Sequence, residues 1–90
     1  MQLKWTNKGL SDLARLHDFL APVNSAAARV VQSLAAAPSG LPAKPRIGER
    51  LEEFDRREVR RILVGNYELR YEIQDQAIYI LRIWHTREAR

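Results

Sequence analysis

The residues best suited to chemistry lie near the end of the chain, where His85 stands between Arg82 and Arg87. A histidine can accept or give a proton near neutral pH, and the fork of an arginine can hold a phosphate. Such groups could cleave RNA without a metal if cations surround the scissile phosphate and one group takes the 2′-hydroxyl proton. The alternative is that His85 only anchors the chain end by hydrogen bonds. The spacing leaves both interpretations open.

Arginines also recur along the apolar runs that precede this end of the chain. A basic surface over these runs could be formed by Arg60, Arg61, Arg70 and Arg82. Acidic residues fall in the same region and would pair with several of them: Glu58, Glu68, Glu72 and Asp75. Because an arginine fork suits carboxylates as well as phosphates, the pattern predicts either a binding surface or an internally paired, solvated face.

The sequence contains no recognisable metal or cofactor site, and we expect neither group. It has no cysteine, and no second histidine or carboxylate stands at metal-ligand spacing beside His17. His17 falls on the apolar stripe of a predicted helix, so we interpret it as a partly buried structural residue. No glycine-rich phosphate loop is present.

Length and composition predict one small domain that covers residues 1–90. No apolar run is long enough to span a bilayer, so we expect no membrane association, and the absence of cysteine is compatible with the cytosol. The net charge is +4, from 15 basic and 11 acidic residues. That charge could favour nucleic acid or an acidic protein as a partner, but on charge alone an ordinary soluble surface is the better interpretation.

Three runs rich in β-branched and aromatic residues predict an antiparallel meander: Val59–Val64, Tyr67–Ile73 and Ala77–Trp84. Gly65 and Asn66 fit a two-residue II′ turn, and Asp75 and Gln76 mark the second turn.

Alternation along the runs assigns the faces of this sheet. In the middle run, one face is predicted to be buried by Tyr67, Leu69, Tyr71 and Ile73, and the other to be wet with Glu68, Arg70 and Glu72. The last run is apolar on both faces, which predicts an interior strand. Regular alternation would place Arg82 and Trp84 on the face of Ile78 and Ile80, and His85 opposite.

The N-terminal half predicts a strand and two helices. Gln2–Trp5 alternates like a strand. A helix then begins after a cap at Thr6 or Asn7 and ends near Ala21. Its apolar stripe, widened by Leu16 and Phe19, is made of Leu10, Leu13, Ala14, His17, Leu20 and Ala21. A second helix follows a cap at Asn24 or Ser25 and ends at Pro38, with Ala27, Val30, Val31 and Leu34 as its stripe.

The segment between the second helix and the meander predicts a loop and a short charged element. The range 41–48 is a loop, and the range 49–58 permits one or two helical turns with the ion pairs Glu52–Arg56 and Glu53–Arg57. The predicted fold is α+β: a small, mostly antiparallel sheet packed on one face against a two-helix hairpin, in the order β-α-α-β-β-β.

Three short motifs resemble the RelE/ParE toxin superfamily. The stretch from Val59 to Tyr67, continued by Leu69 and Tyr71, resembles the family's hairpin. The stretch from Ile80 to Arg87 is similar to its closing strand with a His-x-Arg ending, and the range 48–54 is similar to one branch of the family. The element order matches too, so the resemblance covers essentially the whole chain.

The resemblance implies the toxin half of a bacterial type II toxin–antitoxin pair, located in the cytoplasm. Such a toxin is neutralised by a cognate antitoxin that is partly disordered when free, and a toxin–antitoxin hetero-oligomer is possible. ParE-like members poison DNA gyrase, whereas RelE-like members are enzymes that cut mRNA on the ribosome. A catalytically silent binding domain that acts only within the complex is a further alternative.

The resemblance also implies site residues. A RelE-like site would use His85, Arg60, Arg82 and Arg87 for catalysis. Antitoxin or target binding is expected at Arg60, Arg70, Arg82 and Trp84, and charge reversal at Arg82 should weaken it. Glu68 stands where the family often has an arginine, and lysine is absent after Lys44. Both departures favour the gyrase interpretation and a protein that is not an enzyme.

Overall fold

The computed structural model describes residues 1–20, 22, 24–54 and 56–88. Its strands are β1 (Gln2–Trp5), β2 (Glu49–Arg50), β3 (Glu58–Val64), β4 (Tyr67–Gln74) and β5 (Ala77–His85). Its helices are α1 (Asn7–Leu20), α2 (Ser25–Ala36) and two short 3₁₀ turns, η1 (Ala37–Gly40) and η2 (Glu52–Phe54). The predicted α+β order is confirmed, with β2 as an additional short strand. The predicted end of the first helix at Ala21 lies outside the described residues.

The strands form one mixed sheet in the order β1-β5-β4-β3-β2. β1 runs parallel to β5, and the other neighbours are antiparallel. β5 is an interior strand, as its two apolar faces predicted. The N-terminal strand β1 therefore forms one edge of the sheet and pairs with β5, the last strand in the sequence.

Both hairpin turns have the backbone of a II′ turn at their first central residue. Gly65 has φ +60° and Asp75 has φ +56°, whereas neither Asn66 nor Gln76 has a positive φ. Glycine adopts this conformation without steric cost, which confirms the predicted turn at Gly65. Asp75 adopts it less easily because it carries a Cβ.

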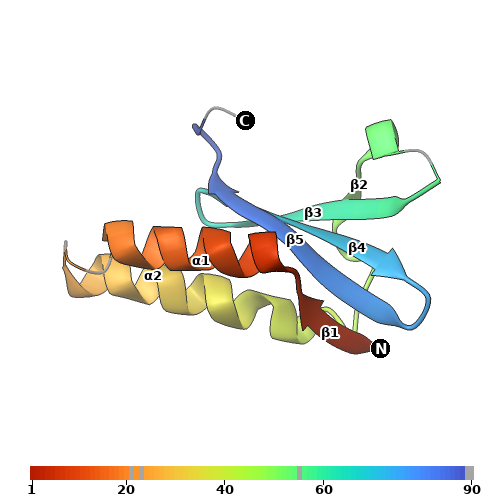
Figure 1. Cartoon of the computed structure of the whole chain (residues 1–90), viewed down its shortest axis with the longest axis horizontal. Helices are drawn as coiled ribbons and strands as arrows, with labels where there is room; N and C mark the ends of the chain where they lie inside the picture. Colours follow the sequence, from red (N-terminus) through yellow and green to blue (C-terminus); the bar gives the residue numbers. More distant parts are fainter. Residues whose placement is uncertain (21, 23, 55, 89–90) are drawn as a thin grey trace.

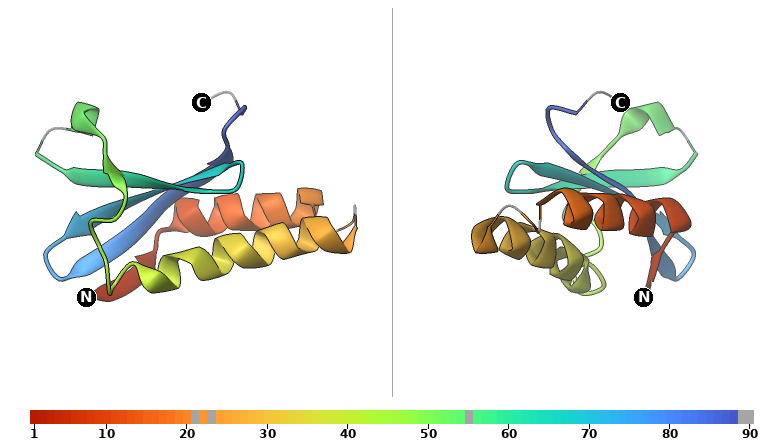
Figure 2. Two further views of the ribbon diagram at one scale, coloured as in Figure 1. Left: turned by 180° about the vertical axis from the view of Figure 1, so that it is seen from behind. Right: turned by 60° about the vertical axis from the view of Figure 1, so that its left-hand side comes forward.

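The helices lie side by side along one face of the sheet, and η2 lies on the other side (Figures 1 and 2). Asn24 caps α2, since its Oδ1 accepts from the Ala27 N–H at 2.8 Å. On this covered face, Leu16, Leu34 and Leu41 enter one core with Leu69, Tyr71, Ile73, Ile78, Ile80 and Ile83. The predicted helical hairpin on one sheet face is confirmed. Among the described residues, no helix is long and apolar enough to cross a membrane.

The predicted buried side of α1 was only partly right. Leu16 is buried and Leu13 and Leu20 pack against the core, whereas Leu10, Ala14, His17 and Phe19 are exposed. The inward side of the helix also includes Gly9 and Asp12. Gly9 approaches β5 so closely that a Cβ would lie 2.5 Å from the Ile80 carbonyl oxygen. A buried aspartate and a contact that only glycine allows have no apolar signature, so the hydrophobic pattern could not reveal this part of the buried side.

Beyond the end of β1, side chains at the start of and within α1 bond the backbone groups at the edge of β5. The Thr6 hydroxyl caps α1 by accepting from the Gly9 N–H at 3.0 Å and donates to the Ile80 carbonyl at 2.7 Å. Asp12 accepts from the Ile83 N–H at 2.9 Å, and Arg15 donates to the Ile83 carbonyl at 3.4 Å. These side chains satisfy edge groups that a longer β1 would otherwise pair.

A β-bulge changes the predicted faces of β5. The register passes from Arg70↔Arg82 to Tyr71↔Ile80, so Leu81 is an extra residue. Ile83 consequently joins Ile80 on the covered face, and Arg82 and Trp84 move to the uncovered face. The predicted alternation was therefore wrong beyond Leu81.

The prediction of helical turns in the range 49–58 was largely wrong. Glu49 and Arg50 pair with Arg61 and Arg60 as β2, and only η2 is helical. Arg57 bonds Glu72 on β4, at 2.8 and 3.0 Å, rather than the predicted Glu53. Ion pairs one turn apart contribute only about 0.2–0.5 kcal/mol, which strand pairing easily exceeds.

The predicted loop at 41–48 is confirmed and is fastened to the sheet by Tyr71. The Tyr71 hydroxyl donates to the Pro45 carbonyl at 2.7 Å and accepts from the Gly48 N–H at 3.0 Å. Arg60 donates to the Gly48 carbonyl at 2.7 Å. Burial raises the pKa of Tyr71, which keeps its hydroxyl available as a donor.

Candidate binding cleft on the uncovered sheet face

Four side chains form a stack on the sheet face opposite the helices. The Arg70 guanidinium lies 4.8 Å from the Trp84 ring centroid and 5.7 Å from that of Phe54, and Arg82 lies 5.5 Å from the Trp84 centroid. We call Phe54, Arg70, Trp84 and Arg82 the arginine–aromatic stack. Cation–π contacts hold both guanidinium planes in place.

Glu68 lies beneath this face and is only 2% exposed, so the prediction of a fully wet face on β4 was wrong. Its carboxylate accepts from Arg70 Nε at 2.8 Å and from Arg61 Nη1 at 3.4 Å. A buried carboxylate needs such partners. Glu68 therefore anchors two arginines from below and does not project toward a ligand.

Asp12 of α1 holds Arg82 in the same way. Arg82 donates from Nε at 2.7 Å and from Nη2 at 3.3 Å to the two carboxylate oxygens. The hydrogen bond with Asp12 raises the pKa of Arg82. A glutamate at position 82 would face Asp12 directly, so charge reversal there would disturb the fold as well as any binding.

A cleft of about 510 Å³ opens beside the stack. It is lined by Thr6, Asn7, Lys8, Phe54, Arg57, Val59, Arg70, Leu81 and Arg82. Four of these residues are cationic and none is acidic, and α1 begins at its wall, where helix N–H groups also favour anions. We call this cavity the basic cleft.

The basic cleft suits an anionic, partly apolar ligand. Arg57 and Arg82 each keep about half of their side chains exposed. An arginine has five N–H donors, so those not used in the internal pairs can bind a carboxylate or a phosphate. Phe54, Val59 and Leu81 add apolar walls.

His85 lies away from this cleft. It pairs with Tyr67 and belongs to the covered side, where its ring meets the Tyr67 ring edge-on at 5.1 Å. Its Nδ1 accepts the Arg87 N–H at 3.0 Å, which matches the interpretation of a histidine that anchors the chain end.

The structure therefore separates the residues of the predicted catalytic set. Arg60 pairs with Tyr71 on the covered side and bonds Glu58 and Gly48. Arg82 is on the uncovered face, and His85 and Arg87 are at the end of β5. Of the predicted binding residues, Arg70, Arg82 and Trp84 come together, whereas Arg60 does not join them.

Sequence reasoning missed several residues of this site: Lys8, Asp12, Phe54 and Arg57. They come from α1 and from the segment around η2, far from β4 and β5 in the sequence. Asp12 shares the buried side of α1 with Gly9 and Leu16, but neither glycine nor aspartate carries an apolar signal that would mark this side in the sequence. No local pattern marks Phe54 as a partner of Arg70.

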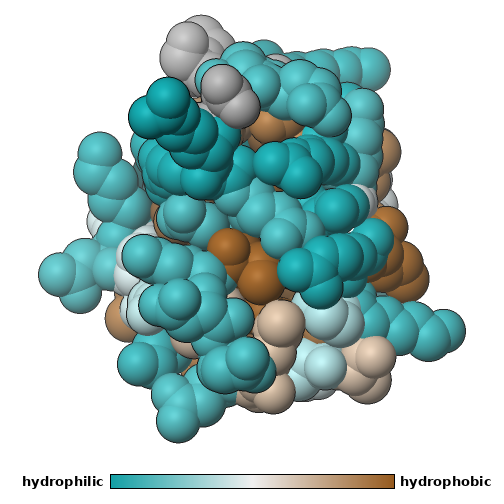
Figure 3. Space-filling model, turned by 90° about the vertical axis from the view of Figure 1, so that its right-hand side faces the viewer, coloured by the Kyte–Doolittle hydropathy of each residue, from teal (hydrophilic) through white to brown (hydrophobic). Residues whose placement is uncertain are grey.

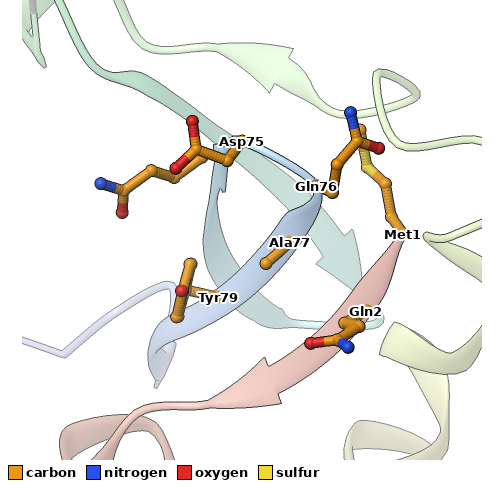
Figure 4. A pocket seen from close by; sticks show the side chains of 7 residues that line it. Met1, Gln2, Asp75, Gln76, Ala77 and Tyr79 are labelled. Carbon is orange, nitrogen blue, oxygen red and sulfur yellow. The ribbon is translucent and has the colours of Figure 1, made fainter.

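A second cleft, of about 490 Å³, has a different lining. It lies between the start of β1 and the turn that joins β4 to β5, among Met1, Gln2, Asp75, Gln76 and Tyr79 (Figure 4). Its lining side chains include amides and a carboxylate but no arginine or lysine, so it suits an anion poorly. The surface at this end of the molecule is mainly hydrophilic with small hydrophobic areas (Figure 3).

Solved structures with this fold come from toxin–antitoxin systems. The chain is similar to a chromosomal ParDE system from P. aeruginosa, with 23% identity, a TM-score of 0.74, and coverage of 94% of this chain and 95% of that one. It is similar to the RelBE2 toxin–antitoxin complex from Mycobacterium tuberculosis, with 26% identity, a TM-score of 0.66, and coverage of 93% and 88%. The archaeal RelE–RelB complex from Pyrococcus horikoshii OT3 is more distant, with 17% identity, a TM-score of 0.57, and coverage of 98% and 97%.

Comparison with curated proteins finds no match. The profile of one protein family, described as the ParE toxin of the type II toxin–antitoxin system parDE, matches residues 3–90. This match spans nearly the whole chain and includes every element that builds the basic cleft. The chain therefore belongs to the family of ParE toxins of type II toxin–antitoxin systems.

Proposed function

We propose that this toxin acts as ParE-like members do, by poisoning DNA gyrase, and that a cognate antitoxin neutralises it by covering the basic cleft. The observation that supports the gyrase target best is the separation of His85 from Arg82. Metal-free RNA cleavage needs a proton acceptor beside the cations that hold the scissile phosphate. Here the histidine and the clustered cations occupy different sides of the sheet.

Ribosome-dependent mRNA cleavage is the second candidate, favoured by the basic cleft itself. Lys8, Arg57, Arg70 and Arg82 converge on a space that could hold a phosphodiester. The described residues that line the cleft include no histidine, tyrosine or carboxylate to take a proton. This candidate therefore needs a group from outside the cleft or from the ribosome.

Induction of the toxin without its antitoxin separates the two targets. We expect growth arrest with gyrase-dependent DNA breaks and intact transcripts. His85→Gln should remain toxic, because glutamine keeps an acceptor for the Arg87 N–H. Ribosome-dependent cuts in mapped transcripts that disappear in His85→Gln would overturn the gyrase assignment. Normal growth with soluble toxin would count against both activities and favour a silent binding domain.

The basic cleft supports a partner segment that carries carboxylates beside apolar side chains. The carboxylates would meet the arginine forks, and the apolar groups would fill the space around Phe54 and Val59. A disordered segment can wrap so small a protein, at an entropic cost. Covering the cleft would also block a target that needs the same cations.

Charge reversal at Lys8 tests this surface without breaking an internal pair. Lys8 is exposed in the first turn of α1, where a glutamate suits the helix dipole. We expect Lys8→Glu to weaken antitoxin binding about tenfold, with a reduced dependence on salt. Lys44→Glu makes the same charge change in the loop away from the cleft and should leave affinity within about twofold of the wild type. Equal calorimetric affinities for the two variants would remove the cleft from the antitoxin surface.

A further inference from the structure

The ion pairs around the basic cleft are all oriented in the same way. In each pair the arginine is more exposed than the carboxylate that holds it: Arg57 with Glu72, Arg70 with Glu68, and Arg82 with Asp12. The Arg57 and Arg82 side chains are 51% and 42% exposed, whereas their carboxylate partners are 12% and 8% exposed. An anion that enters the cleft therefore meets the positive end of each pair first, and attraction to the nearer charge exceeds repulsion from the more distant one.

Three parts of the described chain supply donors that no internal pair uses. The Lys8 ammonium, at the start of α1, has no ion-pair or hydrogen-bond partner among the described residues. Arg57 and Arg82 each use Nε and Nη2 for their carboxylates, so their Nη1 groups are not engaged in these pairs. Each Nη1 carries two N–H donors. The cleft thus offers an ammonium and two NH₂ groups to the oxygens of one multiply charged anion.

The rest of the lining suits a flat, partly apolar group with a polar edge. Phe54, Val59 and Leu81 form the apolar part of the wall. The exposed Asn7 amide has no partner among the described residues, and an asparagine amide can donate to and accept from the edge of a nucleobase at the same time. The cleft volume of about 510 Å³ falls in the range of small-molecule sites. These features together fit a ligand that joins a base to several phosphates.

We propose that the basic cleft binds a nucleoside polyphosphate. Its phosphate oxygens would accept from Lys8, Arg57 and Arg82, and its base would lie against the apolar wall within reach of Asn7. Binding would occupy cations that the antitoxin segment also needs, so the nucleotide would weaken neutralisation. This inference rests on the proposed antitoxin site and adds a small ligand that regulates access to it.

Calorimetry on the free toxin tests the ligand class, with ATP as the probe and with adenosine and inorganic triphosphate as its two halves. We expect ATP to bind with an affinity that falls as salt is added, because salt screens the charged contacts. Each half should bind at least about tenfold more weakly than ATP, since it contacts only one part of the cleft. Absence of ATP binding would overturn the proposal, and so would equal affinities for ATP and triphosphate. Tighter binding of a single-stranded oligodeoxynucleotide would overturn the free nucleotide in favour of a nucleic-acid strand.

Matched variants test whether the nucleotide lies in the basic cleft. Lys8→Glu should lower the affinity for ATP at least about tenfold, whereas Lys44→Glu, the same charge change outside the cleft, should leave it within about twofold. Asn7→Ala should weaken ATP binding about threefold, as expected for one lost hydrogen bond, and leave triphosphate binding unchanged. ATP binding that tolerates Lys8→Glu would place the nucleotide elsewhere and overturn the proposal. Equal losses for ATP and triphosphate in Asn7→Ala would overturn the placement of the base.

Competition with the full-length cognate antitoxin tests the regulation. ATP at about ten times its dissociation constant should weaken the apparent antitoxin affinity about tenfold, because the two ligands exclude one another. Unchanged antitoxin affinity at that concentration would overturn the competition. A toxin that binds its antitoxin but not ATP would overturn this inference alone, and a toxin that binds ATP but not the antitoxin would overturn the proposed function alone.

Discussion

On the covered face of β4, Leu69 and Tyr71 are completely buried among aliphatic side chains, whereas on the opposite face Glu68 and Arg70 form an ion pair beside Trp84. The residues alternate along one strand, and each set is held by contacts of a different kind. The covered face is held by apolar burial, and the uncovered face by paired charges and stacked rings.

This difference separates stability from recognition. Apolar burial is the main favourable contribution to folding. Paired charges contribute less but keep several guanidinium groups at the surface in fixed positions. Substitutions of buried residues on the covered face should therefore lower the stability of the toxin, and substitutions of the exposed cations on the uncovered face should mainly change what it binds.

The largest expected effect is on the covered face. Ile80→Ala should lower the free energy of unfolding by about 2–5 kcal/mol, because Ile80 is fully buried in the core. Leu63→Ala removes a similar side chain from an exposed position and should change stability by less than about 0.5 kcal/mol. Urea unfolding of both variants measures the contrast, and equal losses would show that burial does not distinguish the two positions.

The next largest effect on the free energy of unfolding is expected where the loop at 41–48 contacts the sheet. A Cβ at Gly48 would lie 2.7 Å from both the Arg61 carbonyl oxygen and the Tyr71 hydroxyl oxygen. Gly48→Ala should cost about 1–3 kcal/mol, since the backbone at Arg61 cannot yield easily. Gly40→Ala is the matched control, because no atom lies within 4 Å of its Cβ. Thermal unfolding should show a clear loss for the first variant and none for the second.

The ion pairs of Glu58, at the start of β3, should make the stability of the toxin depend on pH. Burial opposes ionisation of Glu58, but hydrogen bonds from Arg60 and Arg46 outweigh it and lower the pKa of Glu58. A lowered folded-state pKa stabilises the protein above the unfolded-state pKa, and this stabilisation disappears as the pH falls through the folded-state value. Glu58→Gln should be less stable than the wild type by about 1 kcal/mol at pH 7. The difference should shrink as the pH falls below the unfolded-state pKa of Glu58 and vanish below its lowered folded-state pKa. A difference that persists in strong acid would contradict the charge-based origin.

The smallest effect is expected at the second hairpin turn, which belongs to neither face. Asp75→Gly should raise stability by about 0.5 kcal/mol, because glycine accepts a φ of +56° more readily than aspartate. Gln76→Gly, at the neighbouring position without a positive φ, should lower stability slightly. Thermal melts of the two variants should move in opposite directions.

The sequence predicted the meander, its first turn and the helical hairpin because each follows from local periodicity and turn chemistry. Val59, Tyr67 and Ala77 begin the three predicted runs, and the strands start within one residue of them. The prediction failed where contacts between distant parts of the chain determine the local structure. The bulge at Leu81, the inward turn of Asp12 and the pairing of Glu49 depend on partners distant in the sequence.

Part of the candidate site was also predictable. Arg70, Arg82 and Trp84 were identified from charge and strand position, and they form most of the arginine–aromatic stack. Lys8 and Phe54 were not, because the sequence does not reveal that α1 and η2 border the same cleft. The role of Glu68 as an anchor likewise required its burial to be known.

The parallel pairing of β1 with β5 has a consequence for how the chain folds. Gln2 finds its partner at Ala77, so β1 gains its neighbour in the sheet only after β5 has been synthesised. β5 also carries Arg82 and Trp84. A nascent chain that stops before Ala77 therefore lacks both the strand between β1 and β4 and two of the proposed binding groups. Such a chain should be unfolded, which limited proteolysis of chains stalled before and after β5 would reveal.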